Sequence, residues 1–129
     1  MRTTYELVRD HYAANERKDL EGMLADIAED CRWTEMDGFP CAGTYVGPGA
    51  VVEGVFKPLG AQFDDYTFTL ECLLDADEKA VGIGNYTAKH KGTGKSMNVR
   101  VVHVWGGSDG KIRSFEQFTD TLRVAETMM

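Results

Sequence analysis

The chain has 129 residues, of which 43% are hydrophobic, and its formal net charge is −7 at pH 7. This length fits one compact domain spanning residues 1–129, and the apolar content excludes a disordered chain. The acidic balance argues against nucleic acid as a partner, because proteins that bind a phosphate backbone usually carry a basic stripe.

The N-terminal part of the chain has helical periodicity, from Thr4 to about Glu29. Apolar residues recur there three or four positions apart, in two sets: Tyr5, Val8 and Tyr12, then Leu20, Met23, Leu24 and Ile27. Asp19 lies between the two sets, and Asp is a favoured residue at the start of a helix. The pattern predicts two helices joined by a tight bend, with Asp19 capping the second.

A short strand is predicted next, within the stretch DCRWTEM. Cys31, Trp33 and Glu35 alternate with other residues and would share one face of that strand. The segment DGFPCAGTYVGPG that follows is rich in Gly and Pro, so we expect it to be a loop.

Residues 49–63 again show helical recurrence, with Pro58 at the frayed end of the helix. Everything after Asp64 has the character of strands, in four runs separated by the turns DADE, GTGK and SDGK. Helices followed by a long antiparallel meander indicate the α+β class, because α/β proteins alternate the two kinds of element.

The last predicted hairpin turns at Asp109-Gly110, a signal for a two-residue type I′ turn. Counting outward from this turn gives the register of the two arms. The expected pairs on one face are Trp105 with Ser114, His103 with Glu116, Val101 with Phe118, and Val99 with Asp120.

That face combines an apolar wall with three ionisable groups, His103, Glu116 and Asp120. Dry surroundings raise the pKa of a carboxyl group, and a carboxyl so tuned can exchange protons near neutral pH. His103 has two interpretations, as a satisfied partner of Glu116 or as a proton relay or hydrogen-bond donor to a substrate oxygen. Asp120 is either an acid–base residue or a hydrogen-bond partner of nearby backbone amides.

The opposite face of the hairpin is expected to carry an apolar strip of Val102, Val104 and Phe115. A contiguous apolar strip on a sheet surface usually marks an interface. We therefore expect a homodimer that packs through the outer faces of the two sheets.

Several other chemistries and locations are not indicated by the sequence. The three histidines lack metal-binding spacing, so no metal site is expected, and neither a GxSxG motif nor a P-loop is present. No apolar run is long enough to cross a bilayer, and MRTTYELVRDHY lacks the apolar stretch of a secretory signal. The three cysteines are widely spaced without a CxxC pair, which is typical of reduced thiols in a cytoplasmic protein.

The order of these elements resembles the nuclear-transport-factor-2-like superfamily, in particular its SnoaL-like polyketide cyclases and ketosteroid isomerases. The resemblance rests on DLEGMLADIAEDCRWTEMDG, AGTYVGPGAVVEGVF, the HVW and DGKI segments, and the closing EQFTDT. It implies a cone-shaped, curved antiparallel sheet wrapped around N-terminal helices. It also implies that Asp120 occupies the acid–base position of SnoaL-like cyclases.

Reading the chain without a gap against ketosteroid isomerases places Glu35 at the position of their catalytic base. The partner positions differ, because Val101 stands where the isomerase has an oxyanion-hole Asp, and His11 stands where it has a helix-one Tyr. Tyr12 lies one residue further on, either lining the pocket or packing in the helix interface. Trp33, on the same face as Glu35, is expected to form pocket wall or core.

Two functional hypotheses follow from these residues. The first is an acid–base enzyme without a cofactor, of isomerase, cyclase or dehydratase type, in which Asp120, His103 and Glu35 move protons on a small, largely apolar carbonyl or hydroxyl compound. The second is a module that binds a small ligand or dimerises without catalysis. The expected lining residues are Trp33, Tyr12, His11, Val101, Trp105, Glu116 and Phe118.

Overall fold

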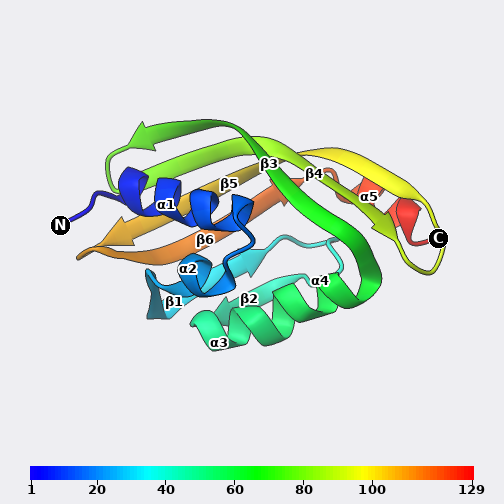
Figure 1. The fold of residues 1–129 in the computed structure, drawn as a ribbon, viewed down its shortest axis with the longest axis horizontal. Coiled ribbons are helices and arrows are strands. Elements are labelled where there is room, and N and C mark those ends of the chain that lie inside the picture. The colour runs from blue at the N-terminus through cyan, green and yellow to red at the C-terminus, as the bar shows by residue number, and fades with distance from the viewer.

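The computed structural model describes all 129 residues, and their elements run along the chain as Figure 1 shows. The helices are α1 (Thr4–Glu16), α2 (Leu20–Leu24), α3 (Pro48–Val51), the π-helix η1 (Val52–Phe56), α4 (Lys57–Gln62) and α5 (Thr121–Thr127). The strands are β1 (Ile27–Glu35), β2 (Gly43–Val46), β3 (Phe63–Ala76), β4 (Lys79–His90), β5 (Ser96–Ser108) and β6 (Lys111–Thr119). No helix has the length and apolar content needed to span a membrane.

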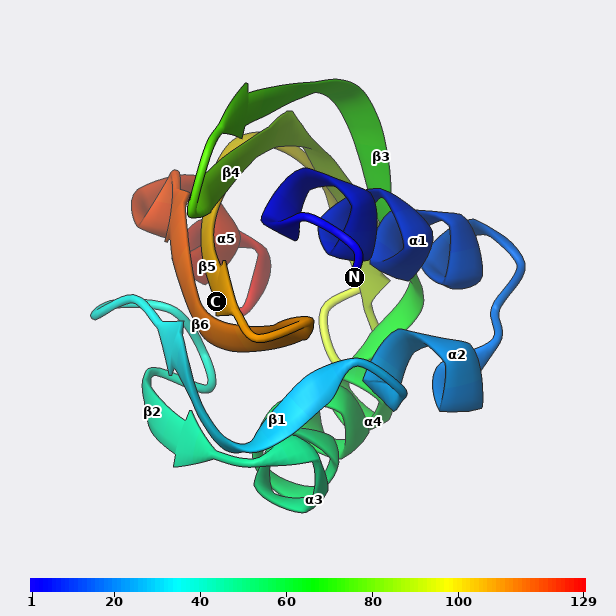
Figure 2. The ribbon, with the colours of Figure 1, turned by 90° about the vertical axis from the view of Figure 1, so that its left-hand side faces the viewer.

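The six strands form a single curved sheet in the order β2-β1-β6-β5-β4-β3. Strands β3 to β6 form the predicted antiparallel meander, whereas β1 pairs with β6 in parallel, so the sheet is mixed instead of wholly antiparallel. Figure 2 shows the sheet curling through most of a circle, with α1 across the side that the strands leave open. The predicted α+β cone around N-terminal helices is confirmed.

The two N-terminal helices begin at the caps that their sequences provide. The Thr3 hydroxyl accepts a hydrogen bond from the Glu6 amide, while the Glu6 carboxylate accepts one from the Thr3 amide, which together form a capping box. The predicted cap at Asp19 is also present, since its carboxylate accepts from the Gly22 amide at 2.9 Å. The second helix ends sooner than expected, because Ile27 already belongs to β1 and pairs with Ile112 of β6.

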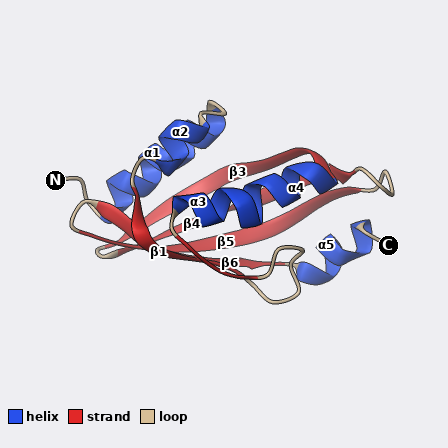
Figure 3. Ribbon diagram, turned by 90° about the horizontal axis from the view of Figure 1, so that it is seen from below, coloured by secondary structure: helices blue, strands red, loops and turns tan.

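The segment predicted as one helix over residues 49–63 is α3, η1 and α4 in continuous succession. Figure 3 shows this unit lying over the sheet and running roughly along β3 and β5. Val51, Val55 and Leu59 on its inner side are buried in the core at helical spacing. Strand β2 was missed in the Gly- and Pro-rich segment, where it forms an edge strand against β1.

The register of the last hairpin differs from the prediction by one residue. The turn pairs Ser108 with Lys111 as expected, but Gly106 then pairs with Ser114 and Gly107 with Ile112, which leaves Arg113 as the extra residue of a β-bulge. Every later residue of β6 is therefore turned to the other face. The predicted strip of Val102, Val104 and Phe115 was wrong for this reason, because Phe115 points inward and is 3% exposed.

Three predicted site residues lie outside the interior, two of them, Glu116 and Phe118, because of this bulge. Glu116 now pairs with Val104, and Phe118 pairs with Val102, on the outer face of the sheet. Asp120 lies beyond the end of β6, as the first residue before a helix α5 that was not predicted. All three side chains are exposed.

Candidate functional site

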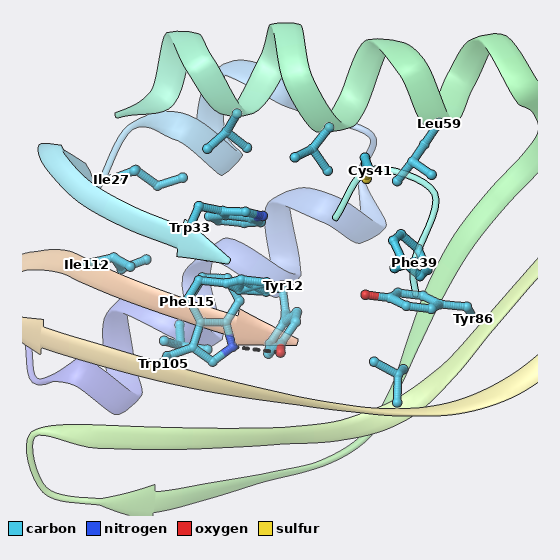
Figure 4. Close-up of a cluster of buried hydrophobic side chains, with 14 of the residues drawn as sticks. Tyr12, Ile27, Trp33, Phe39, Cys41, Leu59, Tyr86, Trp105, Ile112 and Phe115 are labelled. Carbon is cyan, nitrogen blue, oxygen red and sulfur yellow. Dashed lines mark hydrogen bonds between the residues drawn. The ribbon is translucent and has the colours of Figure 1, made fainter. Parts of the chain in front are cut away.

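A cavity of about 400 Å³ lies between the concave face of the sheet and the helices α1, α2, η1 and α4. Its lining is mainly apolar and aromatic, and it includes no lysine or arginine. Figure 4 shows two groups of side chains facing each other across this interior, with Trp33, Phe115 and Tyr12 on one side and Phe39, Cys41 and Tyr86 on the other. Such a lining suits a small, largely apolar molecule.

Glu35 contributes the only buried carboxyl group of this cavity. It ends β1 on the same face as Cys31 and Trp33, as predicted, and it is 3% exposed. The Cys41 thiol lies 3.9 Å from its Oε1 atom, whereas Oε2 has no hydrogen-bond partner in the protein. Glu35 therefore has one oxygen free to interact with a bound molecule.

Burial raises the pKa of Glu35 from 4.5 to about 8. The Trp33 indole and the Cys41 thiol act in the opposite direction, yet the indole makes no formed hydrogen bond and the thiol is a weak donor. Desolvation therefore prevails, and Glu35 exchanges its proton close to neutral pH. This is the property that general acid–base catalysis requires.

His103 lies at the centre of a buried hydrogen-bond network. Its Nδ1 atom is 2.8 Å from the Tyr12 hydroxyl, and its Nε2 atom is 2.7 Å from the Tyr86 hydroxyl. Burial, followed by the nearby His11, lowers the pKa of His103 from 6.5 to about 3. The ring is therefore neutral at physiological pH, with one nitrogen donating and the other accepting.

The two tyrosine hydroxyls also accept hydrogen bonds from outside this triad. Trp105 Nε1 donates to Tyr12 at 2.8 Å, and Gln117 Nε2 donates to Tyr86 at 2.9 Å. One tyrosine must donate to the accepting nitrogen of His103, while the other accepts from both His103 and its outer partner. The second tyrosine therefore retains a hydroxyl hydrogen that neither His103 nor its outer partner accepts, and both tyrosines line the cavity.

His11 also lines the cavity and is neutral. Its Nδ1 atom is 2.9 Å from the Met23 carbonyl oxygen, so Nδ1 carries the hydrogen and Nε2 keeps its lone pair. Burial lowers the pKa of His11 to about 4. His11 thus offers an acceptor, and neither buried histidine brings a positive charge to the site.

Trp33 combines tight packing with an unused polar atom. Its indole stacks on Phe115 with 3.9 Å between ring centroids, and the residue is 4% exposed. Its Nε1 atom has no hydrogen-bond partner in the protein. Figure 4 shows that nitrogen on the side of the ring that faces Cys41 and Tyr86 across the interior.

The structure brings most of the predicted site residues together. Those that line the cavity are Glu35, His103, Trp33, Tyr12, His11 and Trp105. Val101 is buried in the core but does not line the cavity. No group of three or more His, Cys, Asp or Glu side chains is arranged to hold a metal ion.

Glu116, Phe118 and Asp120 lie outside the cavity, contrary to the prediction. The physical reason is the bulge at Arg113, which turns Glu116 and Phe118 outward. Asp120 instead caps α5, where its carboxylate accepts a hydrogen bond from the Arg123 amide at 3.1 Å. This is the backbone-binding alternative that the sequence had left open.

Sequence reasoning missed the contribution of β4, above all Tyr86. The available signal was the run of Gly82, Gly84 and Tyr86 on one face of the strand. A Cβ atom at Gly82 would collide with Tyr12, and one at Gly84 would collide first with the Thr69 carbonyl oxygen of β3 and then with the Phe68 ring. These glycines therefore make room for the aromatic side chains of the cavity.

The comparisons with known proteins agree with this architecture. The model of the SnoaL-like domain family matches residues 8–115. An NTF2-like protein from Burkholderia thailandensis E264 is 53% identical, with 100% of this chain and 99% of that chain covered and a TM-score of 0.98. No curated protein matches the sequence.

Two more distant structures share the fold. TerC, co-crystallised with polyporic acid, is 21% identical over 97% of both chains, with a TM-score of 0.86. A protein with a ketosteroid isomerase-like fold from Catenulispora acidiphila DSM 44928, in complex with trimethylamine, is 17% identical. It covers 97% of this chain and 93% of its own, with a TM-score of 0.79.

Proposed function

We propose that this chain, which belongs to the SnoaL-like domain family, is an acid–base enzyme of isomerase, cyclase or dehydratase type. The proposal follows from the titratable carboxyl group that its cavity encloses. The observation that carries this proposal is Glu35, a buried carboxyl with a pKa near 8 and one unpartnered oxygen. Fold alone would not support it, since one scaffold can host unrelated functions.

The proposed chemistry is transfer of a proton within one bound molecule. Ionised Glu35 removes a hydrogen from a carbon next to a carbonyl group, and the electron pair of that C–H bond forms an enolate. The resulting carboxylic acid returns the proton to another atom of the same molecule. In a cyclisation the enolate carbon adds to a second carbonyl carbon of the same molecule, the π bond of that carbonyl breaks, and its oxygen takes the proton from Glu35. In a dehydration the enolate expels the hydroxyl group on the next carbon, which takes the proton from Glu35 and leaves as water.

The polar groups around Glu35 suit the charge that develops during such a step. An enolate oxygen needs a hydrogen-bond donor that is already in place. The unused hydroxyl hydrogen of Tyr12 or Tyr86 and the Trp33 indole N–H are both donors in the cavity wall. His103 supports the tyrosines without carrying charge, which makes it a positioning residue in this proposal.

The lining also indicates the class of substrate. Without lysine or arginine, the cavity has nothing to compensate the cost of burying a carboxylate or phosphate of a ligand. Both histidines are neutral at physiological pH. We therefore expect a neutral, mainly apolar carbonyl compound, small enough for about 400 Å³.

The test uses 2-tetralone, a small neutral ketone with exchangeable hydrogens beside its carbonyl. NMR in deuterated buffer measures how fast the protein replaces those hydrogens with deuterium. Glu35→Gln is expected to lower the protein-catalysed rate by roughly 100-fold or more, because a positioned acid–base group commonly contributes that much.

Asp120→Asn is the matched control, since Asn also caps helices and Asp120 lies outside the cavity. This variant should exchange 2-tetralone as fast as the wild-type protein. Equal rates for Glu35→Gln and the wild type, or a wild-type rate no faster than buffer, would contradict the proposal. Circular dichroism of each variant checks that the fold is retained.

A second proposal concerns the outer face of the sheet. Phe118 is 43% exposed there and pairs with Val102, beside half-buried Val104. These three residues, the outer strip, replace the strip predicted from the sequence. We propose that the outer strip packs against a second copy of this chain, which is compatible with either an enzyme or a binding module.

A further inference from the structure

Two buried polar side-chain atoms in this protein lack any hydrogen-bond partner, and they are neighbours. They are the Trp33 indole nitrogen and the Glu35 Oε2 atom. Both side chains are on the same face of β1, two residues apart, which separates their backbones by about 7 Å. Both residues line the cavity.

The indole N–H makes no formed hydrogen bond in the protein, although it lies close enough to the Glu35 carboxyl to lower the pKa of that group. A buried donor without a partner destabilises the folded protein relative to one that is bonded. Trp33 packs through its ring faces and edges, on Phe115, Phe56 and Trp105, none of which requires a nitrogen. A purely structural role would be filled as well by another aromatic residue.

We propose that Trp33 Nε1–H donates a hydrogen bond to the carbonyl oxygen of the bound ligand, and so places the adjacent carbon beside Glu35. The claim that this carbon is the one that loses its proton rests on the proposed function. The claim that Trp33 donates a hydrogen bond to the ligand does not. In a ketone, the carbonyl carbon carries the oxygen and the next carbon carries the exchangeable hydrogens. The donor that binds the oxygen and the base that removes a hydrogen must therefore also be neighbours. Trp33 and Glu35 meet that requirement.

The local contacts orient the two atoms for this task. The Cys41 thiol occupies the Oε1 side of the carboxyl, which leaves Oε2 for a ligand. The effect of the indole on the pKa of Glu35 indicates that the two groups are close. The stack on Phe115 fixes the plane of the indole, so the direction of the N–H bond is set before a ligand arrives.

The tyrosine pair is the competing donor for the same oxygen. Each hydroxyl of Tyr12 and Tyr86 has two partners, His103 and one outer donor, and only one of the two hydroxyls keeps a spare hydrogen, whereas the indole N–H makes no formed hydrogen bond in the protein. The Trp33 N–H therefore has no formed hydrogen bond to give up when a ligand binds, and the Glu35 carboxyl is its neighbouring acceptor in the protein. This difference favours Trp33 as the group that donates a hydrogen bond to the carbonyl oxygen.

The experiment compares 2-tetralone with tetralin, which has the same ring frame without the oxygen. Equilibrium dialysis gives the Kd of each compound for the wild type, Trp33→Phe and Tyr86→Phe. In Trp33→Phe the ratio of the 2-tetralone Kd to the tetralin Kd should rise about fivefold to tenfold, the value of one hydrogen bond of about 1 kcal/mol. Tyr86→Phe measures the competing donor and should raise that ratio less than Trp33→Phe does, whereas Asp120→Asn, outside the cavity, should leave it unchanged.

An unchanged ratio in Trp33→Phe, or a ratio that rises as much or more in Tyr86→Phe, would overturn the inference. So would the absence of saturable 2-tetralone binding to the wild type. Proton NMR of the wild type gives a readout that does not depend on a variant. Of its two indole N–H signals, the one missing from Trp33→Phe should shift with 2-tetralone and not with tetralin.

The outcomes separate this inference from the proposed function. If Glu35→Gln abolishes deuterium exchange while Trp33→Phe keeps the wild-type Kd ratio, the acid–base proposal stands and the role of Trp33 is wrong. If Glu35→Gln exchanges normally while Trp33→Phe changes the ratio, the binding role stands and the acid–base proposal fails.

Discussion

Glu35 is the residue whose chemistry most depends on its surroundings. Its pKa is 4.5 in an ordinary setting and about 8 in the folded protein. Between these values the unfolded chain carries an ionised Glu35, while the folded protein keeps the proton. The folded state then binds more protons than the unfolded state, so the contribution of Glu35 to stability decreases as pH rises through this window.

We expect the free energy of unfolding of the wild type, minus that of Glu35→Gln, to fall by about 1.4 kcal/mol per pH unit between about pH 4.5 and 8. Urea unfolding of both proteins across this range measures it. Subtracting the variant is essential, because His11 and His103 have lowered pKa values and act with the opposite sign in acid. A constant difference between the two proteins would contradict the burial of an ionisable Glu35.

How far single residues could be predicted depends on which element carries them. Trp33 and Glu35 were placed correctly, because simple alternation holds at the end of β1. His103 and Trp105 were also placed inside, since β5 alternates regularly until its glycines. Asp120 was misplaced, because nothing in its neighbourhood distinguishes a strand residue from the cap of a short helix.

At the scale of elements, the bulge in β6 decided which predictions failed. The turn at Asp109-Gly110 was predicted correctly, but the one unpaired Arg113 turned every residue of β6 from Ser114 onward to the other face. Arg113 has a local reason to lie there, since its guanidinium is 2.9 Å from the Asp30 carboxylate. Such a bulge depends on contacts between segments that are distant in the chain, and the periodicity of a single strand gives no information about those contacts.

Helix α4 offers a test of the cavity through two glycines. Gly60 lines the cavity and Gly49 of α3 does not, yet a Cβ atom at either would meet open space. Leucine at each position should stabilise its helix by a similar amount, up to about 1 kcal/mol. Gly60→Leu alone should weaken 2-tetralone binding, by roughly tenfold, because its side chain enters space that the ligand needs.

The check on this pair is thermal unfolding together with equilibrium dialysis. Similar melting temperatures with weaker binding only in Gly60→Leu would locate the ligand in the cavity described here. If Gly49→Leu weakened binding equally, or if neither did, the ligand would bind elsewhere on the protein.

At the scale of the whole molecule, the general architecture was more predictable than its details. The order of helices before strands indicated the α+β cone, and the shared motifs indicated the family. The parallel pairing of β1 with β6 was not predictable from local pattern, because it joins segments far apart in the chain. The positions of β2 and α5 were likewise hidden in segments with strong loop or strand signals.

The outer strip allows a prediction for the assembled protein. Analytical ultracentrifugation should show the wild type at about twice the chain mass of 14.3 kDa. Phe118→Glu should shift it toward the monomer, because charges at the centre of an apolar interface are costly to bury. Leu122→Glu is a suitable control, since Leu122 is exposed on α5 outside the outer strip. A monomeric wild type, or equal effects of both variants, would rule out this interface.

The triad of Tyr12, His103 and Tyr86 can adopt two states that differ only in the positions of hydrogen atoms. When Nδ1 of the imidazole bears the hydrogen, Tyr12 is the tyrosine with a spare O–H; when Nε2 bears it, the spare O–H belongs to Tyr86. Exchanging the two tautomers relocates a donor from one wall to the opposite one while every heavier atom stays still. A molecule that rotates or rearranges between those walls could thus meet a donor at each end of its path, within a rigid scaffold.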